Sequence, residues 1–192
     1  MMTGNNHGSI EKIGGQWYVF YHRQTHLNTF SRQGCAEKIT IMPDGSIPQA
    51  EMTSCGLNDG PLLAEGTYPA SICCNLTDGH MIHAGQQDCP EPMPNITHEG
   101  TEHFIAGITD HVTVGYKYFA FDGETTLQIT LRGQATGRLT VLLDNAVQGE
   151  ITITPDAAWH TVSLPLNARG THALYLEYQG EGSLDIMDLT FA

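Results

Sequence analysis

Short stretches of alternating apolar and polar residues, separated by turn-forming residues, constrain the fold of this chain more than any other feature. From Phe104 onward such stretches recur at near-regular spacing, and turn signals such as Asp122-Gly123 and Gly180-Glu181-Gly182 separate them. Glycine and aspartate tolerate the positive φ angles at which a chain reverses direction. No segment shows three turns of amphipathic helix, so the pattern predicts an all-β protein whose second half is a β-sandwich. The predicted sandwich strands are residues 116–121, 126–132, 137–143, 150–153, 160–164, 172–178 and 184–191.

The start of the chain predicts two successive antiparallel hairpins. Residues 16–22 alternate aromatic side chains and follow Gly14-Gly15, a turn that would pair them with residues 10–13. Residues 36–42 alternate again, and residues 47–52 return after a Pro-Asp-Gly-Ser turn.

Between these hairpins and the sandwich the composition shifts to Gly, Pro, Asn, Asp and His, with prolines at alternate positions 90, 92 and 94. Such a composition is typical of a connector. One strand is expected at residues 68–76. We therefore predict three parts, with an N-terminal part at residues 1–76, a linker at 77–102 and the sandwich at 103–192.

The charge of the chain excludes two classes of partner. Eight Lys plus Arg against 21 Asp plus Glu give a formal net charge of −13, which repels phosphate backbones and anionic lipids. No run approaches the length of an apolar membrane span, and the first residues show no export signal. We expect neither nucleic acid nor a membrane as partner, whereas the charge permits a neutral glycan.

Neither the cysteines nor the acidic residues mark a catalytic or metal site by their spacing. Five cysteines are too few for a disulfide scaffold, and the adjacent Cys73 and Cys74 are expected to be thiols on opposite faces of a strand. No nucleophile elbow or phosphate-binding loop is present. Arg23 and Arg32 flank a polar loop, where a guanidinium group could bind vicinal hydroxyls or pair with Glu11 or Glu37.

Aromatic residues in or beside the predicted sandwich strands offer platforms on which the C–H face of a sugar stacks. They are Tyr116, Tyr118, Trp159, Tyr175 and Tyr178. A sandwich of this size also needs aromatic residues in its core, so both roles remain open. Tyr175 and Tyr178 have odd spacing on one strand, and at least one of them should point outward.

Two groups of motifs resemble known families. Asn5-Asn6-His7-Gly8-Ser9, the Trp-Tyr-Val-Phe-Tyr-His-Arg-Gln stretch at 17–24, residues 30–33 and residues 66–70 resemble the C-terminal part of glycoside hydrolase family 43. That family holds α-L-arabinofuranosidases and β-xylosidases. Residues 114–119, Arg132-Gly133 and the stretches 170–175 and 180–184 resemble carbohydrate-binding module family 6, a β-sandwich that often follows such enzymes.

The resemblance implies a fold and an activity. Family 43 enzymes are five-bladed β-propellers that invert the anomeric centre with an Asp base, a Glu acid and a second Asp. All three lie N-terminal to the His-Gly-Ser motif, so no residue here matches them, and we expect this chain alone to be inactive. The fold class expected is a partial five-bladed β-propeller, about the last blade, followed by a jelly-roll sandwich. Family members occur both secreted and cytoplasmic, so we infer no compartment.

The resemblance also assigns candidate site residues. His7 resembles a histidine that helps to hold calcium on the propeller axis, and Arg32 resembles an arginine that reaches the sugar in the −1 subsite. Tyr116 and Trp159 fall near the two stacking aromatics of the module. The asparagine that completes the module's cleft is replaced by Gly182-Ser183-Leu184-Asp185, in which Asp185 matches a structural calcium ligand or is a surface carboxylate.

The expected partner is therefore a plant cell-wall polysaccharide such as arabinoxylan or xylan, with structural calcium as the cofactor. Two functions follow. The chain is a glycan-binding part of a hydrolase, or it is a propeller segment of an active enzyme that another chain completes, with a purely structural sandwich.

Overall fold

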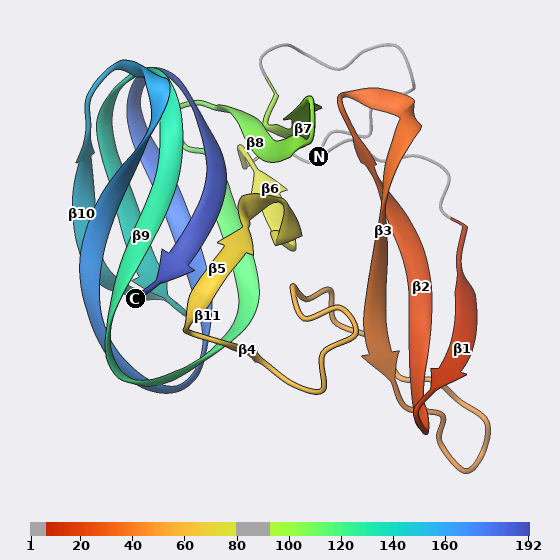
Figure 1. Ribbon diagram of the computed structural model, residues 1–192. Helices are drawn as coiled ribbons and strands as arrows, with labels where there is room; N and C mark the ends of the chain where they lie inside the picture. The colour runs from red at the N-terminus through yellow and green to blue at the C-terminus, as the bar shows by residue number, and fades with distance from the viewer. Residues whose placement is uncertain (1–6, 80–92) are drawn as a thin grey trace.

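Two β-sheets account for the regular structure of the computed structural model, which describes residues 7–79 and 93–192 (Figure 1). The smaller sheet is an antiparallel meander of β1 (Ser9–Ile13), β2 (Gln16–Thr25) and β3 (Asn28–Ile39). The larger has eight strands. These strands are β4 (Leu62–Leu63), β5 (Gly66–Pro69), β6 (Asn75–Thr77), β7 (Asn95–Glu99), β8 (Glu102–Ile108), β9 (Thr113–Leu143), β10 (Ala146–Ile153) and β11 (Asp156–Phe191). A 3-10 helix, η1 (Ala70–Ile72), connects β5 and β6.

The first predicted hairpin is confirmed, and the second is wrong. Gly14 and Gly15 have φ angles of 57° and 93°, so they form the tight β1–β2 turn that the sequence indicated. Residues 36–39 instead end β3, which pairs with β2. The turn at residues 43–46 forms, but residues 47–52 are not a strand. Pro48 lacks the N–H that a ladder requires, which disfavours a strand there.

The larger sheet follows the order β10-β9-β11-β8-β7, with β4 and β6 added to β9 and β5 added to β11. β9 and β11 are long strands that each combine three of the predicted ones, because the chain bends at glycines without losing its pairing. Leu174 pairs with both Tyr116 and Leu143, so one segment of β11 lies between two segments of β9. The sheet therefore curls into the sandwich seen on the left of Figure 1.

Close backbone approach at one bend requires glycine. A Cβ atom added to Gly133 would lie 2.3 Å from the carbonyl oxygen of Ser183 and 2.6 Å from the Cα of Leu184. The φ angle of Gly133 is 151°, which side-chain-bearing residues rarely adopt. This glycine thus lets two segments of the curled sheet pack against each other.

The core lies inside the curled sheet. Ile105, Phe119, Ile129, Leu174 and Leu176 are all fully buried, and the aromatic rings of Phe119 and Phe191 pack at 4.8 Å between centroids. Burying a large apolar side chain contributes about 1.5–3 kcal/mol. Among the described residues, no helix reaches the length and apolar character that a membrane crossing requires.

The larger sheet includes strands from outside the predicted sandwich at residues 103–192. β4, β5 and β6 fall in the predicted N-terminal part, but they pair with β9 and β11, for example Thr67 with Thr190. β7 falls in the predicted linker and pairs with β8. Residues 80–92, in the middle of that linker, lie outside the described residues. The local pattern did not show these pairings because each partner is distant in sequence.

Polar contacts join the two sheets. The Arg23 side chain, 8% exposed, donates hydrogen bonds from β2 to the carbonyl oxygens of Ser71 and Cys73. Directly after β2, the backbone N–H of His26 donates to the carbonyl oxygen of Ile96 at 2.8 Å. The smaller sheet is thus attached to the larger one by contacts around the C-terminal end of β2 and by Gln33 of β3, which donates to the carbonyl oxygen of Ser71 at 3.2 Å.

Candidate carbohydrate-binding site

An arginine lies against two aromatic rings at one end of the sandwich. Trp159, near the start of β11, is half-buried and meets Phe104 of β8 edge-on, with 5.4 Å between ring centroids. The guanidinium carbon of Arg132 lies 4.3 Å from the Trp159 centroid and 4.9 Å from the Phe104 centroid. A cation so close to a ring face is attracted by the ring quadrupole. Arg132 therefore covers part of the Trp159 ring surface.

Two carboxylates hold Arg132 in this position. Its terminal nitrogens donate to the two oxygens of Glu99 at 2.8 and 3.1 Å, and its Nε donates to Asp185 at 3.1 Å. The hydrogen bonds to Glu99 raise the pKa of Arg132, and the same contact lowers the pKa of Glu99. The bidentate geometry fixes the plane of the guanidinium group.

These five side chains can bind a polyol through two kinds of contact. The exposed part of Trp159 offers an apolar surface for a sugar's C–H groups, and Glu99, with 60% of its side chain exposed, can accept hydrogen bonds from hydroxyls. We name this group the Arg132 cluster: Glu99, Phe104, Arg132, Trp159 and Asp185.

Two of the residues that we predicted from the sequence, Trp159 and Asp185, are brought together in this cluster through Arg132. Arg132 itself appeared in the sequence only as part of a module motif, and Glu99 and Phe104 were not recognised as site residues. Alternation with the buried Leu131 indicates that Arg132 points away from the core. Its contacts come from β7, β8 and β11, and only the tertiary structure supplies them.

Tyr116 is not a sugar platform, which corrects the sequence prediction. Its side chain is 0% exposed, and its hydroxyl donates to the carbonyl oxygen of Ala70 at 3.1 Å. Burial raises the pKa of this phenol well above its ordinary value. Alternation along β9 places Tyr116 on the inner face of the sheet, so no ring face reaches solvent.

Tyr175 and Tyr178 divide between surface and core, as their odd spacing predicted. Tyr178 is fully buried and donates to the carbonyl oxygen of Glu181 at 2.7 Å. Tyr175 is half-buried, and its ring lies so close to Gly115 that a Cβ atom added there would be 2.7 Å from the ring. Part of the Tyr175 ring is therefore used in packing.

His7, which precedes β1, and Arg32 of β3 lie apart from the Arg132 cluster. His7 is exposed, and its ring stacks on that of His22 with 6.2 Å between centroids. Arg32 is exposed on β3, opposite Gln24 of β2. The structure does not bring either residue to the predicted sugar contacts of the sandwich.

Structural calcium at His7 or Asp185 stays a prediction of the resemblance. Among the described residues, no group of three or more His, Cys, Asp or Glu side chains is arranged to hold a metal ion. Both oxygens of Asp185 already accept hydrogen bonds, one from Arg132 and one from the backbone N–H of Gly107 at 3.3 Å. Calcium takes six to eight oxygen ligands, so a calcium ion at either residue would also need carbonyl, amide or water oxygens.

Apart from the Arg132 cluster, a cavity of about 500 Å³ lies between β2, β3 and the segment that contains Ile72, Cys73 and Cys74. Its charged residues are satisfied internally. Glu37, 5% exposed, accepts hydrogen bonds from Tyr21 at 3.0 Å and from the backbone and hydroxyl of Thr53 at 2.8 and 2.7 Å. Arg23 donates to Gln33 at 2.8 Å and to two carbonyls, so it does not pair with Glu37. These contacts fix the junction between the sheets.

Thiols line the same cavity. Cys35, Cys73 and Cys74 are free, and Cys89 lies outside the described residues. Burial raises the pKa of Cys73 to about 11, and it also raises the pKa of Cys35. A protonated thiol is a poor nucleophile and a poor metal ligand at neutral pH. Burial therefore makes these thiols poorly suited to nucleophilic or metal-binding chemistry at neutral pH.

Comparison with known proteins shows that this chain is similar to carbohydrate-active proteins. No protein-family profile matches the chain. A "Xylosidase/arabinosidase" from Thermoclostridium stercorarium is 42% identical over 97% of this chain and 42% of its own length. An "Arabinoxylan arabinofuranohydrolase" from Paenibacillus polymyxa is 24% identical over 97% of this chain and 30% of its own length. The chain thus spans less than half of the curated relatives it matches.

Solved structures match the chain in two ways, one along nearly its whole length and one along its sandwich part. A glycoside hydrolase family 43 arabinoxylan arabinofuranohydrolase from Bacillus subtilis, in complex with cellotetraose, aligns with 98% of this chain and 41% of its own, at a TM-score of 0.62 and 16% identity. CsCBM6-3 from Clostridium stercorarium, in complex with cellobiose, aligns with 70% of this chain and 98% of its own, at a TM-score of 0.56 and 18% identity.

The sandwich accordingly has the fold of family 6 carbohydrate-binding modules. The module aligns with more of the chain than residues 103–192 make up, in agreement with the pairing of β4–β7 into the sandwich sheet. The resemblance of the whole chain to the C-terminal part of glycoside hydrolase family 43, joined to a family 6-like module, is confirmed by these matches.

Proposed function

We propose that this chain acts as the carbohydrate-binding C-terminal part of a plant-polysaccharide glycoside hydrolase, with arabinoxylan or xylan as its ligand. The observation that carries the proposal is the 42% identity to the Thermoclostridium protein named "Xylosidase/arabinosidase" over 97% of this chain. The solved neighbours named for carbohydrate complexes support it at the level of the fold.

Binding would be centred on the Arg132 cluster. A sugar ring stacks on the exposed part of Trp159, while Glu99 accepts hydrogen bonds from vicinal hydroxyls. Arg132 stays in place because Glu99 and Asp185 hold it, so the cluster is ordered before the ligand arrives. Preorganisation of this kind reduces the entropy cost of binding.

The chain by itself would not hydrolyse its ligand. Inverting hydrolysis needs an acid and a base about 6.5–9.5 Å apart on opposite sides of the scissile bond. The resemblance assigns these carboxylates to a part of family 43 enzymes that this chain does not match. The acidic residues of the Arg132 cluster are instead engaged by one guanidinium group.

The three-stranded sheet would belong to the last blade of a five-bladed propeller. A blade has four strands, and β1–β3 supply three of them. Arg32 would contact the sugar of the −1 subsite only in the assembled propeller.

Affinity electrophoresis through gels containing arabinoxylan tests the proposal, together with an assay for released arabinose and xylose. We expect the wild-type chain to be retarded without sugar release, and Trp159→Ala to lose the retardation. Phe30→Ala is the matched control, since Phe30 is a 92% exposed aromatic residue on the smaller sheet. Sugar release by the chain alone would contradict the proposal, as would equal retardation of wild type and Trp159→Ala.

A second candidate is a propeller segment that another chain completes, with a purely structural sandwich. One observation favours it: leaving Leu63 and Val147 aside, the exposed large apolar side chains of the described residues all lie between residues 10 and 57. Mixing this chain with the part of the Thermoclostridium relative that it does not match would then yield release of arabinose or xylose. Retardation by arabinoxylan would be absent before mixing.

A further inference from the structure

Three histidines meet where the β2–β3 turn touches the β7–β8 hairpin. His26 lies in the turn, and its ring contacts His98 of β7 edge-on, with 4.6 Å between centroids. His103 of β8 pairs across the hairpin with His98, and their rings are 5.7 Å apart. Beside them, the backbone N–H of His26 donates to the carbonyl oxygen of Ile96 at 2.8 Å. The imidazoles thus lie beside a backbone hydrogen bond that joins the two sheets.

The hydrogen bond between the His26 and His98 rings limits how many of their nitrogens can be protonated at once. His26 Nε2 and His98 Nδ1 share one hydrogen bond, so one of the two nitrogens must be unprotonated. His26 Nδ1 faces the hydroxyls of Thr25 at 3.0 Å and Ser31 at 2.8 Å, which donate or accept as required. If both His26 and His98 became imidazolium ions, two N–H groups would face each other. Protonation of both rings is therefore incompatible with the contact.

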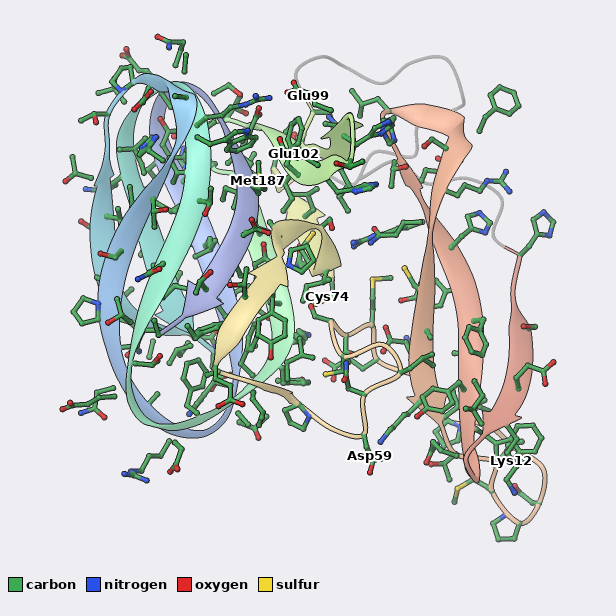
Figure 2. All side chains as sticks on the ribbon, in the orientation of Figure 1. Lys12, Asp59, Cys74, Glu99, Glu102 and Met187 are labelled. Carbon is green, nitrogen blue, oxygen red and sulfur yellow. The ribbon has the colours of Figure 1, made fainter. Side chains whose placement is uncertain are left out.

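No carboxylate in the described structure is directed at His26 to compensate. The charges that act on it are those of His98 and His103, and they lower its pKa after the larger effect of burial. On the hairpin, Glu99 and Glu102 alternate with the two histidines, and Figure 2 labels both. Glu99 is engaged by Arg132 of β9, and Glu102 acts on Asp188 of β11.

The β2–β3 hairpin that carries His26 also has two cationic side chains. Arg23 of β2 is committed to the carbonyls of Ser71 and Cys73, and Arg32 is exposed on β3. Neither would stabilise an imidazolium ion.

The turn itself is held in an unfavourable conformation. His26 and Leu27 have φ angles of 59° and 47°, a region that residues with side chains rarely adopt. Such a conformation persists where surrounding contacts hold it. Loss of the histidine contact would therefore release the turn.

From this geometry we infer that His26, His98 and His103 form a pH-sensitive latch between the three-stranded sheet and the sandwich, closed when the imidazoles are neutral and open when they are protonated. The latch does not rest on the proposed function, because it concerns only the two sheets of this chain. Since Arg23 remains charged throughout, its attachment point stays closed, and opening is local to the β2–β3 turn.

The direction of the pH effect follows from the shared hydrogen bond. A histidine in the unfolded or open state titrates near pH 6.5. Because the closed state binds fewer protons than the open one, its stability is complete above about pH 6.5 and falls as the pH drops below that value. Acidification from pH 7.5 to 5 should open the latch.

Hydrogen exchange of the wild-type chain, corrected for the intrinsic pH dependence of exchange, measures this opening at the His26 amide. We expect its protection to fall severalfold between pH 7.5 and 5, because the open state binds more protons than the closed one. The Ser54 amide, which donates to the carbonyl oxygen of Lys117 away from the histidines, is the internal control and should keep its protection. Unchanged protection of the His26 amide would overturn the inference.

Two variants distinguish opening of the latch from a loss of protection that acidification causes elsewhere in the chain. His98→Gln retains a hydrogen-bonding side chain that cannot be protonated, so protection of the His26 amide should no longer depend on pH. His160→Gln removes a histidine of β11 and should behave as the wild type. His98→Gln could lower protection of the His26 amide at every pH simply by disturbing the contact. In that case His103→Gln is the deciding variant. It leaves the hydrogen bond between His26 and His98 in place and removes only the charge of the third imidazole, so it should reduce the pH dependence of protection. A wild-type pH dependence in both His98→Gln and His103→Gln would contradict the latch.

Discussion

The two sheets share an alternating β pattern, yet they bury their apolar side chains to different degrees. In the sandwich, side chains such as Leu176 and Ile129 are fully enclosed because the long strands curl around them. In the three-stranded sheet, all five residues of β1 are exposed, and Ile13 is 47% exposed. A sheet of three strands has no second layer of its own. The difference shows that alternation supplies an apolar face, whereas closure decides whether that face is covered.

The largest expected difference between the two regions concerns truncation of apolar side chains. Leu176→Ala in the sandwich should lower the free energy of unfolding by about 2–5 kcal/mol, because it removes fully buried methyl groups and leaves a cavity. Ile13→Ala in β1 should change it by less than about 0.5 kcal/mol. Urea unfolding followed by fluorescence measures both. Equal effects would show that the smaller sheet is buried in solution.

A smaller effect is expected on dye binding. The exposed Ile10, Ile13, Ile41, Met42 and Ile47 should bind an apolar fluorescent dye. Replacing Ile10 and Ile13 by threonine, which keeps the β propensity, should reduce dye fluorescence while the unfolding transition of the sandwich stays unchanged. Val147→Thr is the control in the sandwich, where it is 61% exposed. A native chain that binds no dye would contradict the exposure of these apolar side chains.

The smallest expected effect comes from a histidine–aspartate pair of the sandwich. The stability that this pair contributes should change with pH in the direction opposite to that of the latch. His172 contacts Asp144 at 2.8 Å, and this hydrogen bond raises the pKa of His172. A raised pKa gives stability that is complete below about pH 6.5 and is lost as the pH rises through the folded-state value.

Thermal unfolding of the wild type and Asp144→Asn measures this contribution. The difference in stability between them should be about 0.5 kcal/mol at pH 6, because the pair is partly exposed, and smaller at pH 8. A difference that grows with pH would contradict the assignment. The His26 contact should show the reverse trend in hydrogen exchange.

Much of the fold could be predicted from the sequence, because its signals are local. Gly14-Gly15 identified the first hairpin, and turn residues between alternating stretches identified the sandwich strands. The second hairpin was wrong because alternation at residues 47–52 does not guarantee a pairing partner. The partners of β4–β6 were also not predictable, since Thr67 and Thr190 are far apart in the sequence.

The candidate site was less predictable than the fold. Trp159 and Asp185 could be named from the resemblance, and both lie in the Arg132 cluster. Tyr116 and Tyr175 have the same residue type on nearby strands, but one is fully buried and the other is half-exposed. An aromatic residue suits both a core and a sugar platform, and residue type alone does not distinguish them.

The sequence by itself determined the all-β class, the net charge of −13 that disfavours polyanionic partners, and the resemblance to carbohydrate-active proteins. Only the tertiary structure decided that Arg132 covers Trp159, that Tyr116 belongs to the core, and that three histidines meet between the sheets. The physical reason is range: turn and strand preferences act over a few neighbouring residues, whereas burial, ion pairing and ring contacts depend on strands that the fold brings together from distant parts of the chain.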